Sequence, residues 1–138
     1  NRRSKRRNKI IKKMKNIVIV IMFLGGIFNL QAQDFINKDN FNKKIAKGIV
    51  AVEFWASWNA SNEFKDFSKL KDCETYRIDI TTNMEIQGKY SVSAIPTVII
   101  FESGSEKVRF LPNVMFQLDV DKKTIQHSVD TIILNKFQ

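Results

Sequence analysis

The side chains that could carry chemistry are few in this 138-residue chain. It has one cysteine, Cys73, and one histidine, His127. A single cysteine excludes an intramolecular disulfide, and a single histidine makes neither a metal centre nor a catalytic pair by itself. The sequence contains no glycine-rich phosphate loop and no cluster with metal-ligand spacing. We therefore predict no bound metal and no cofactor.

Glu53 is the most unusual carboxylate of the chain, because it lies inside the nearly continuous apolar segment 49–56. Such a segment, rich in β-branched and aromatic residues, is typical of a strand buried on both faces. Burial would raise the pKa of this carboxyl group unless a cation lies beside it. The segment leads into Trp58 and two asparagines three residues apart, Asn59 and Asn62.

The rest of the sequence alternates between helical and strand patterns. The spacing of Phe64, Phe67 and Leu70 favours a helix, and Thr82 with Glu85 has the pattern of a capping box. Alternating helices and strands predict parallel strands joined by crossover helices, and a closing hairpin adds antiparallel strands. The fold class is thus α/β with a mixed sheet. The expected elements are helix 39–47, strand 49–56, helix 61–71, strand 75–80, helix 82–90, strand 96–103, strand 106–111 and a helix that begins at Asp121.

Two motifs carry a resemblance to a known family. The segment 52–62, VEFWASWNASN, resembles the active-site segment of thioredoxins, V-D-F-W-A-x-W-C-x-x-C. The segment 93–104, SAIPTVIIFESG, resembles the second thioredoxin landmark, an I-P-T that leads into a buried strand. The resemblance covers residues 35–138. It implies the thioredoxin fold, in which helices flank a central mixed sheet of four to five strands.

The resemblance places Asn59 and Asn62 at the two redox-cysteine positions. Thiol–disulfide exchange needs a thiolate, and a carboxamide has neither a thiol nor a two-electron redox couple. We therefore predict no catalytic residue and do not expect an enzyme. The residues themselves favour a structural role, in which Asn59 or Ser61 caps the following helix, with contact between Asn59 and a ligand as the alternative.

Pro96 resembles the cis-proline beside the family's active site, where active members bind an extended substrate peptide. The resemblance implies a shallow binding groove for a peptide or protein partner. In the alternative interpretation, Pro96 only fixes a tight loop before the strand. The groove would be lined by Trp58, Asn59, Ala94, Ile95 and Pro96.

Glu53 stands where many thioredoxins have an acid that serves the cysteine pair, and Arg77 stands where they often have a lysine near that acid. The resemblance thus implies a buried Glu53–Arg77 ion pair. A general acid or base at Glu53 is the alternative, although the thiols that it would serve are absent.

Two stretches depart from the family pattern. The segment between positions 62 and 77 is about seven residues shorter than is usual in thioredoxins, which implies a truncated helix. Pro112 stands where active members often have a glycine that lines the groove. Beyond it, Met115, Phe116 and Leu118 are expected to pack into the core, with coverage of the groove or a partner surface as alternatives.

The excess positive charge lies at the beginning of the chain. The formal net charge is +9, and residues 1–33 contain nine Lys or Arg and no acid. Residues 34–138 contain 14 basic and 14 acidic residues, so the expected folded domain has no net charge. Nucleic-acid binding needs a basic surface on the folded body, and we therefore predict no nucleic-acid partner.

Residues 1–33 have the order of a secretory signal peptide. Basic residues end at Lys15, an apolar stretch covers 17–30, and the small residue Ala32 suits cleavage. We therefore expect export to the periplasm or cell envelope. Translation is expected to start at Met14, so that residues 1–13 lie upstream of the translated sequence. One thioredoxin-like domain is expected over residues 34–138. An uncleaved membrane anchor is the alternative, and only that case predicts contact with a membrane.

These observations favour a redox-inactive, thioredoxin-like protein of the cell envelope that binds a peptide or protein. One alternative is residual thiol chemistry through Cys73 or through a cysteine donated by a partner. A structural component of a larger assembly is another. For Cys73 itself we expect an inert, partly buried thiol, because it has no C-x-x-C partner.

Overall fold

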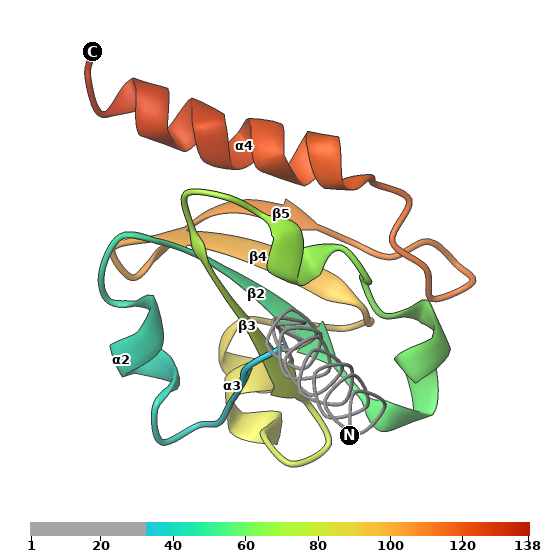
Figure 1. The fold of residues 1–138 in the computed structure, drawn as a ribbon. Helices are drawn as coiled ribbons and strands as arrows, with labels where there is room; N and C mark the ends of the chain where they lie inside the picture. The colour runs from blue at the N-terminus through green and yellow to red at the C-terminus, as the bar shows by residue number, and fades with distance from the viewer. Residues whose placement is uncertain (1–32) are drawn as a thin grey trace, which may run out of the picture. The chain divides into compact units, whose positions relative to one another are not determined.

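A computed structural model describes residues 33–138. In this part of the chain five strands form one mixed sheet in the order β1-β3-β2-β4-β5 (Figure 1). The β1–β3 and β2–β3 pairs are parallel, and the β2–β4 and β4–β5 pairs are antiparallel. The predicted α/β class with a mixed sheet is therefore confirmed. The strands are β1 Phe35–Ile36, β2 Ile49–Trp55, β3 Glu74–Asp79, β4 Thr97–Glu102 and β5 Ser105–Phe110.

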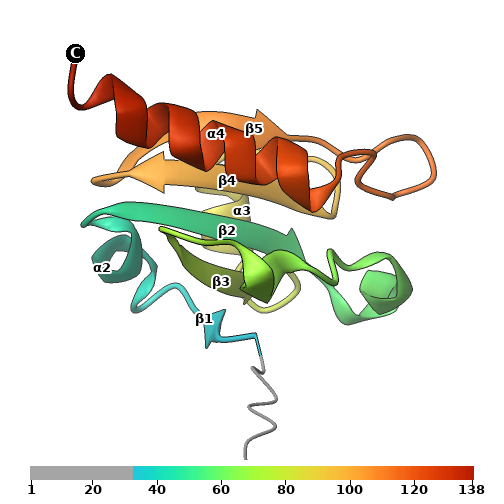
Figure 2. The ribbon, with the colours of Figure 1, turned by 45° about the horizontal axis from the view of Figure 1, so that its top comes forward.

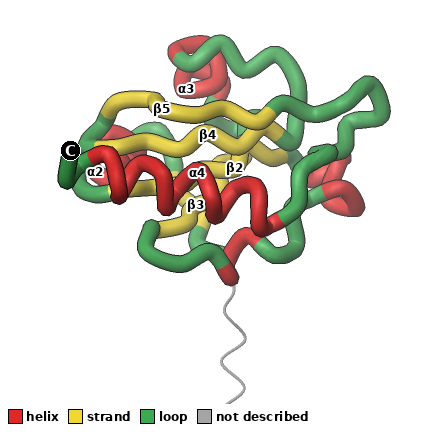
Figure 3. Tube along the Cα trace, turned by 90° about the horizontal axis from the view of Figure 1, so that it is seen from above, coloured by secondary structure: helices red, strands yellow, loops and turns green. Residues whose placement is uncertain are grey.

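Helices cover both faces of this sheet. The short helices α2 (Phe41–Ile45) and α3 (Met84–Lys89) pack on one face. The long helix α4 (Lys122–Asn135) lies across the other face, as Figures 2 and 3 show from two directions. Two 3-10 segments, η1 (Ser57–Asn62) and η2 (Phe67–Lys69), follow β2.

The central strand β2 explains why the core has two halves. Successive side chains of a strand point to opposite faces of the sheet. Val50, Val52 and Phe54 therefore pack toward α2 and α3, whereas Ile49 and Ala51 pack toward η2 and α4. All residues of β2 except Trp55 are buried, as the continuous apolar pattern predicted.

The helix predicted over 61–71 is wrong. The chain forms only the 3-10 segments η1 and η2 there, separated by residues 63–66, the first of which, Glu63, has an extended backbone (φ −59°, ψ 150°). A spacing of three residues also matches the three-residue turn of a 3-10 helix. Phe67 and Leu70 are buried on the α4 side without a full helix, and Phe64 packs against them.

The ends of the other elements follow local hydrogen bonding. The capping box predicted at Thr82 is wrong, because α3 follows Asn83, whose side chain does not cap it. Asn83 instead accepts from the Lys38 N–H (2.8 Å) and donates to the Asp79 carbonyl (2.8 Å), joining two loops. The start predicted for the last helix is confirmed, since Asp121 accepts from the Thr124 N–H at 2.9 Å. The sequence did not predict β1.

The leader and signal peptide predicted for residues 1–33 lie, apart from Gln33, outside the described residues. Gln33 donates through its side-chain amide to the Thr75 carbonyl at 2.9 Å. None of the helices within residues 33–138 combines the length and the apolar character of a transmembrane helix.

Candidate functional site

The redox-motif positions lie where β2 ends and β4 begins. These two strands are antiparallel, with Phe54 paired to Thr97, so the residues after β2 meet the residues before β4. Asn59 in η1 is therefore brought next to Ile95, although 36 residues separate them in the chain. The Ile95–Pro96 peptide bond is cis.

The Asn59 side chain is buried and hydrogen-bonded on both sides. Only 7% of the residue is exposed. Its amide nitrogen donates to the Ile95 carbonyl (3.3 Å) and to the Phe116 carbonyl (3.0 Å), and its oxygen accepts from the Asn62 amide at 2.8 Å. The expected capping role of Asn59 or Ser61 is wrong, because Ala56 precedes η1 and no side chain caps it. Asn59 instead joins the loop before β4 to the loop after β5.

Gln117 extends this arrangement. Its side-chain amide donates to the Asn62 oxygen at 3.3 Å, so three carboxamides, Gln117, Asn62 and Asn59, form a continuous hydrogen-bonded chain. We call these three residues the carboxamide chain. Sequence reasoning missed Gln117, because nothing in the local pattern places it beside a residue 55 positions earlier.

The loop after β5 is closed by its own hydrogen bonds. Pro112 and Leu118 form an isolated antiparallel bridge. The Asn113 side-chain oxygen accepts from the Met115 and Gln117 N–H groups (2.8 and 3.1 Å), and its amide donates to Asp119 (2.8 Å). A loop held in this way can present side chains outward at fixed positions.

Exposed apolar side chains gather at this end of the sheet, among them Trp58 at 61%, Val114 at 96%, Met115 at 66% and Phe116 at 46%. The Trp58 and Phe116 rings meet edge to face with centroids 5.7 Å apart. We call these four residues the apolar loop surface. In Figure 1, η1 and the orange loop after β5 meet at the same end of the sheet. The expectation of core packing is thus wrong for Met115 and Phe116, while Leu118 does pack against the α4-side core.

The residues of the predicted groove differ in accessibility. Asn59, Ile95 and Pro96 are buried, Ala94 is half-buried and Trp58 is exposed. The Ile95 carbonyl already accepts from Asn59, and the Ala94 carbonyl accepts from the Thr97 hydroxyl at 2.7 Å. An extended ligand that pairs with these carbonyls would have to share them with the donors already present or displace those donors.

Glu53 and Arg77 lie face to face on the α4 side of the sheet, on paired positions of β2 and β3. Glu53 is fully buried, and its carboxylate accepts from Arg77 Nε (2.7 Å) and Nη2 (2.6 Å) and from the Phe64 N–H (2.8 Å). Arg77 also reaches Glu63 at 3.2 Å, a partner that sequence reasoning missed. The pair thereby holds the segment that replaces the expected helix 61–71.

Burial has the largest effect on the pKa of Glu53. Desolvation raises the pKa of its carboxyl group, and the opposing effects of Arg77 and the Phe64 N–H only reduce that shift. A proton at this site has no thiol to serve, because the only cysteine of the chain, Cys73, lies just before β3.

Cys73 and His127 stay apart from these groups. Cys73 packs against the α4-side core, and burial, with Asp72 and Asp130 nearby, raises the pKa of its thiol to about 11. His127 is exposed on α4. Among residues 33–138, no three metal-ligating side chains gather at one place.

Asn59→Ala is expected to lower the free energy of unfolding by about 2–3 kcal/mol, because it leaves the buried Ile95 carbonyl and the partly buried Phe116 carbonyl without their donor. The backbone amides of the loop after β5 should also exchange hydrogen faster, since the loop loses its bond to η1. Urea denaturation and amide hydrogen exchange measure the two effects. The matched control is Asn62→Ala, which removes two less buried hydrogen bonds and should cost less than about 1 kcal/mol. If both variants lost the same free energy of unfolding, Asn59 would not be the residue that mainly holds these loops together.

Comparison with known proteins shows similarity to thioredoxins. The thioredoxin family model matches residues 33–115. The Mycoplasma genitalium thioredoxin is 33% identical over 76 residues, which cover 49% of this chain and 74% of that protein. The Bacillus subtilis thioredoxin is 29% identical over 98 residues, which cover 60% of this chain and 89% of that protein.

Solved structures show the same fold at lower identity. A mutant thioredoxin from Halobacterium salinarum superposes with a TM-score of 0.60 at 16% identity, covering 72% of this chain and 88% of its own. A mutant thioredoxin from Entamoeba histolytica gives 0.56 at 21% identity, with 72% and 99% covered. The family match spans β2, η1 and the Ile95–Pro96 turn, which are the elements that carry the two sequence motifs. This chain therefore belongs to the thioredoxin family, as a member with asparagine at both redox-motif positions.

Proposed function

We propose that this protein is a redox-inactive thioredoxin-family member of the cell envelope that binds a peptide or protein partner through the apolar loop surface. The observation that carries the proposal is the replacement of both thiols by Asn59 and Asn62, whose side chains tie η1 to the neighbouring loops. In active thioredoxins these two positions carry out redox chemistry. In this protein, they hold the loop after β5 in place.

The apolar loop surface supports the binding part of this proposal. Residues 110–118 contain no charged side chain, and Val114, Met115 and Phe116 project from a loop that is closed by hydrogen bonds. Exposed apolar side chains gathered at one place are typical of protein interaction sites, and a rigid loop lowers the entropy cost of binding. The partner would contact side chains at this surface, because the Ile95 carbonyl is already occupied by Asn59.

The redox part is tested by disulfide reduction. We expect no turnover of a disulfide substrate by the native protein and none by Cys73→Ser. With a pKa of about 11, only about one Cys73 thiol in a thousand is ionised at pH 8, so its alkylation by iodoacetamide should be correspondingly slow. Turnover that disappears in Cys73→Ser would overturn the proposal and support residual chemistry through this thiol.

The binding part is tested by site-specific photo-crosslinking in cells. A photoreactive residue in place of Val114 should give a discrete adduct in the envelope fraction, and Trp58→Ala should weaken it. The matched control places the same photoreactive residue at Lys43, an exposed position on α2, which packs on the face of the sheet opposite α4. This position should give no such adduct. Identical adducts from both positions, or adducts confined to cytoplasmic proteins, would contradict the proposal.

A further inference from the structure

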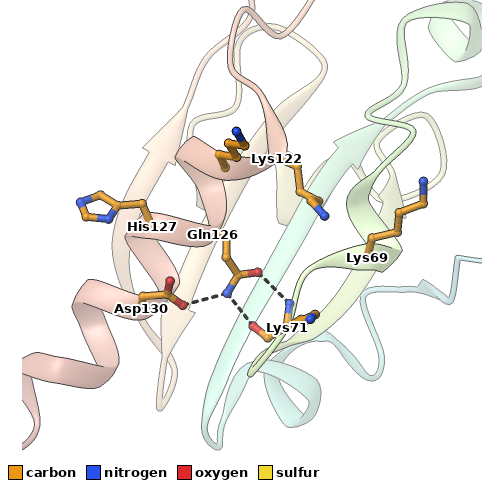
Figure 4. Close-up of a pocket in the computed structure, with 7 residues that line it drawn as sticks. Lys69, Lys71, Lys122, Gln126, His127 and Asp130 are labelled. Carbon is orange, nitrogen blue, oxygen red and sulfur yellow. Dashed lines mark hydrogen bonds between the residues drawn. The ribbon is translucent and has the colours of Figure 1, made fainter.

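A basic hollow lies on the α4 side of the molecule, and none of its lining residues belongs to the apolar loop surface. It has a volume of about 380 Å³ and lies between the segment 69–71 and the first turns of α4 (Figure 4). Lys69 and Lys71 come from one wall, and Lys122 and Lys123 come from the other. Figure 4 shows His127 pointing away from the gap between the walls.

Gln126 fixes the two walls relative to each other. Its side-chain oxygen accepts from the Lys71 N–H (2.8 Å), and its amide donates to the Lys71 carbonyl (3.0 Å) and to Asp130 (2.9 Å), as Figure 4 shows. The backbone positions of the lysines are therefore set before any ligand arrives, while their long side chains can still adjust.

Three carboxylates around the hollow accept hydrogen bonds, and one of them, Asp66, is paired with a cation. Asp66 pairs with Lys69 at 2.7 Å, Asp121 accepts from Thr124, and Asp130 accepts from Gln126.

Three cations at the hollow are left unpaired. Within residues 33–138, no carboxylate oxygen lies within 4.0 Å of the Lys71, Lys122 or Lys123 ammonium group. The domain 34–138 has no net charge, so this gathering of positive charge is local.

The segment that precedes Lys69 and Lys71 in the chain forms no full helix. Where the sequence predicted a helix over 61–71, the chain makes two 3-10 segments, and Leu70 after them has an extended backbone. The apolar side chains Phe67 and Leu70 still reach the core under α4. Lys122 and Lys123, at the start of α4, line the hollow on its other side.

We propose that this hollow binds a small polyanion that carries two or more linked phosphate groups. Three unpaired ammonium groups on two opposing walls suit a ligand with several adjacent charges better than a single carboxylate. A volume of about 380 Å³ accommodates a di- or triphosphate group. The hollow shares no residue with the carboxamide chain, so the inference does not rest on the proposed function.

Isothermal titration of the full chain with inorganic tripolyphosphate tests this site. We expect saturable binding that weakens as the salt concentration rises. Lys71→Gln/Lys122→Gln should weaken binding by about tenfold or more, because two of the three unpaired cations are lost. In nuclear magnetic resonance spectra, the side-chain amide signals of Gln126 should shift on titration.

Two controls keep the test decisive. Lys43→Gln/Lys47→Gln changes the net charge equally at exposed positions on and just after α2, and it should change the affinity by less than about twofold. Sulfate at equal ionic strength should not compete. The proposal is overturned by an absence of saturable binding at millimolar tripolyphosphate, by equal losses in both double variants, or by competition from sulfate.

Discussion

Arg77→Met is expected to lower the free energy of unfolding by about 3–5 kcal/mol near neutral pH. Glu53 is fully buried, and Arg77 is the cation that faces it, at 2.6 Å. Without the guanidinium, the carboxylate would be ionised in an apolar interior or would have to take up a proton. Arg77 also holds Glu63 at 3.2 Å, so the segment between η1 and η2 should loosen as well.

This loss of stability should depend on pH in a defined direction. Burial already raises the folded-state pKa of Glu53 above its unfolded value, and Arg77 opposes that shift. When the folded-state pKa of a carboxyl group is raised, the folded state binds the proton more tightly than the unfolded state does. This contribution to the free energy of unfolding is fully present below the unfolded pKa, about 4.3, and is lost as the pH rises through the folded pKa. Removing Arg77 raises the folded pKa further. The deficit of Arg77→Met should therefore be largest at pH 7–8 and smaller at pH 5, as measured by urea denaturation at each pH.

Two variants provide the controls. Lys107→Met removes an exposed partner of Glu102 and should change the free energy of unfolding by less than about 0.5 kcal/mol. Glu53→Gln/Arg77→Met removes both charges and should recover part of the loss, because no unpaired buried charge remains. A deficit in Arg77→Met that is as small as in Lys107→Met, or that does not change with pH, would show that the pair is not a strong contributor to stability.

Asn59→Cys/Asn62→Cys is expected to form an intramolecular disulfide and to raise disulfide reduction at least about tenfold above the native background. The two side chains already touch, with 2.8 Å between the Asn62 amide nitrogen and the Asn59 oxygen. The gain should nevertheless be limited, because η1 is a six-residue 3-10 segment with a non-helical backbone at Asn59. A short 3-10 segment has fewer aligned peptide dipoles than an α-helix. It should therefore lower the pKa of the introduced thiol less than the N-terminus of an α-helix would.

The matched control for this variant is Asn59→Ser/Asn62→Ser. It removes the same carboxamides without introducing thiols, so it should lose stability to a similar extent and show no reduction. Both variants are measured in a Cys73→Ser background, with mass spectrometry under non-reducing conditions reporting the disulfide. Equal activity in the serine and cysteine variants would show that the turnover does not come from these two positions.

The sequence by itself determined the strands that form the centre of the sheet. The apolar segment 49–56 became β2 (Ile49–Trp55), and segment 96–103 became β4 (Thr97–Glu102). These predictions hold because a strand covered on both faces needs a long run of apolar residues, which few other structures can accommodate. The two motifs at Trp58 and Pro96 likewise identified the family, since each is a local pattern of residue types.

Only the tertiary structure decided how the residues after β2 are arranged. A spacing of three between apolar residues fits an α-helix and a 3-10 turn alike, and the buried Glu53 carboxylate, which accepts from the Phe64 N–H, helps to hold the shorter form in place. The partners of Asn59 lie 36 and 57 residues away, and Gln126 meets a backbone 55 residues earlier. Contacts of this kind leave no periodicity in the sequence, because they depend on where folded segments meet and not on their own patterns.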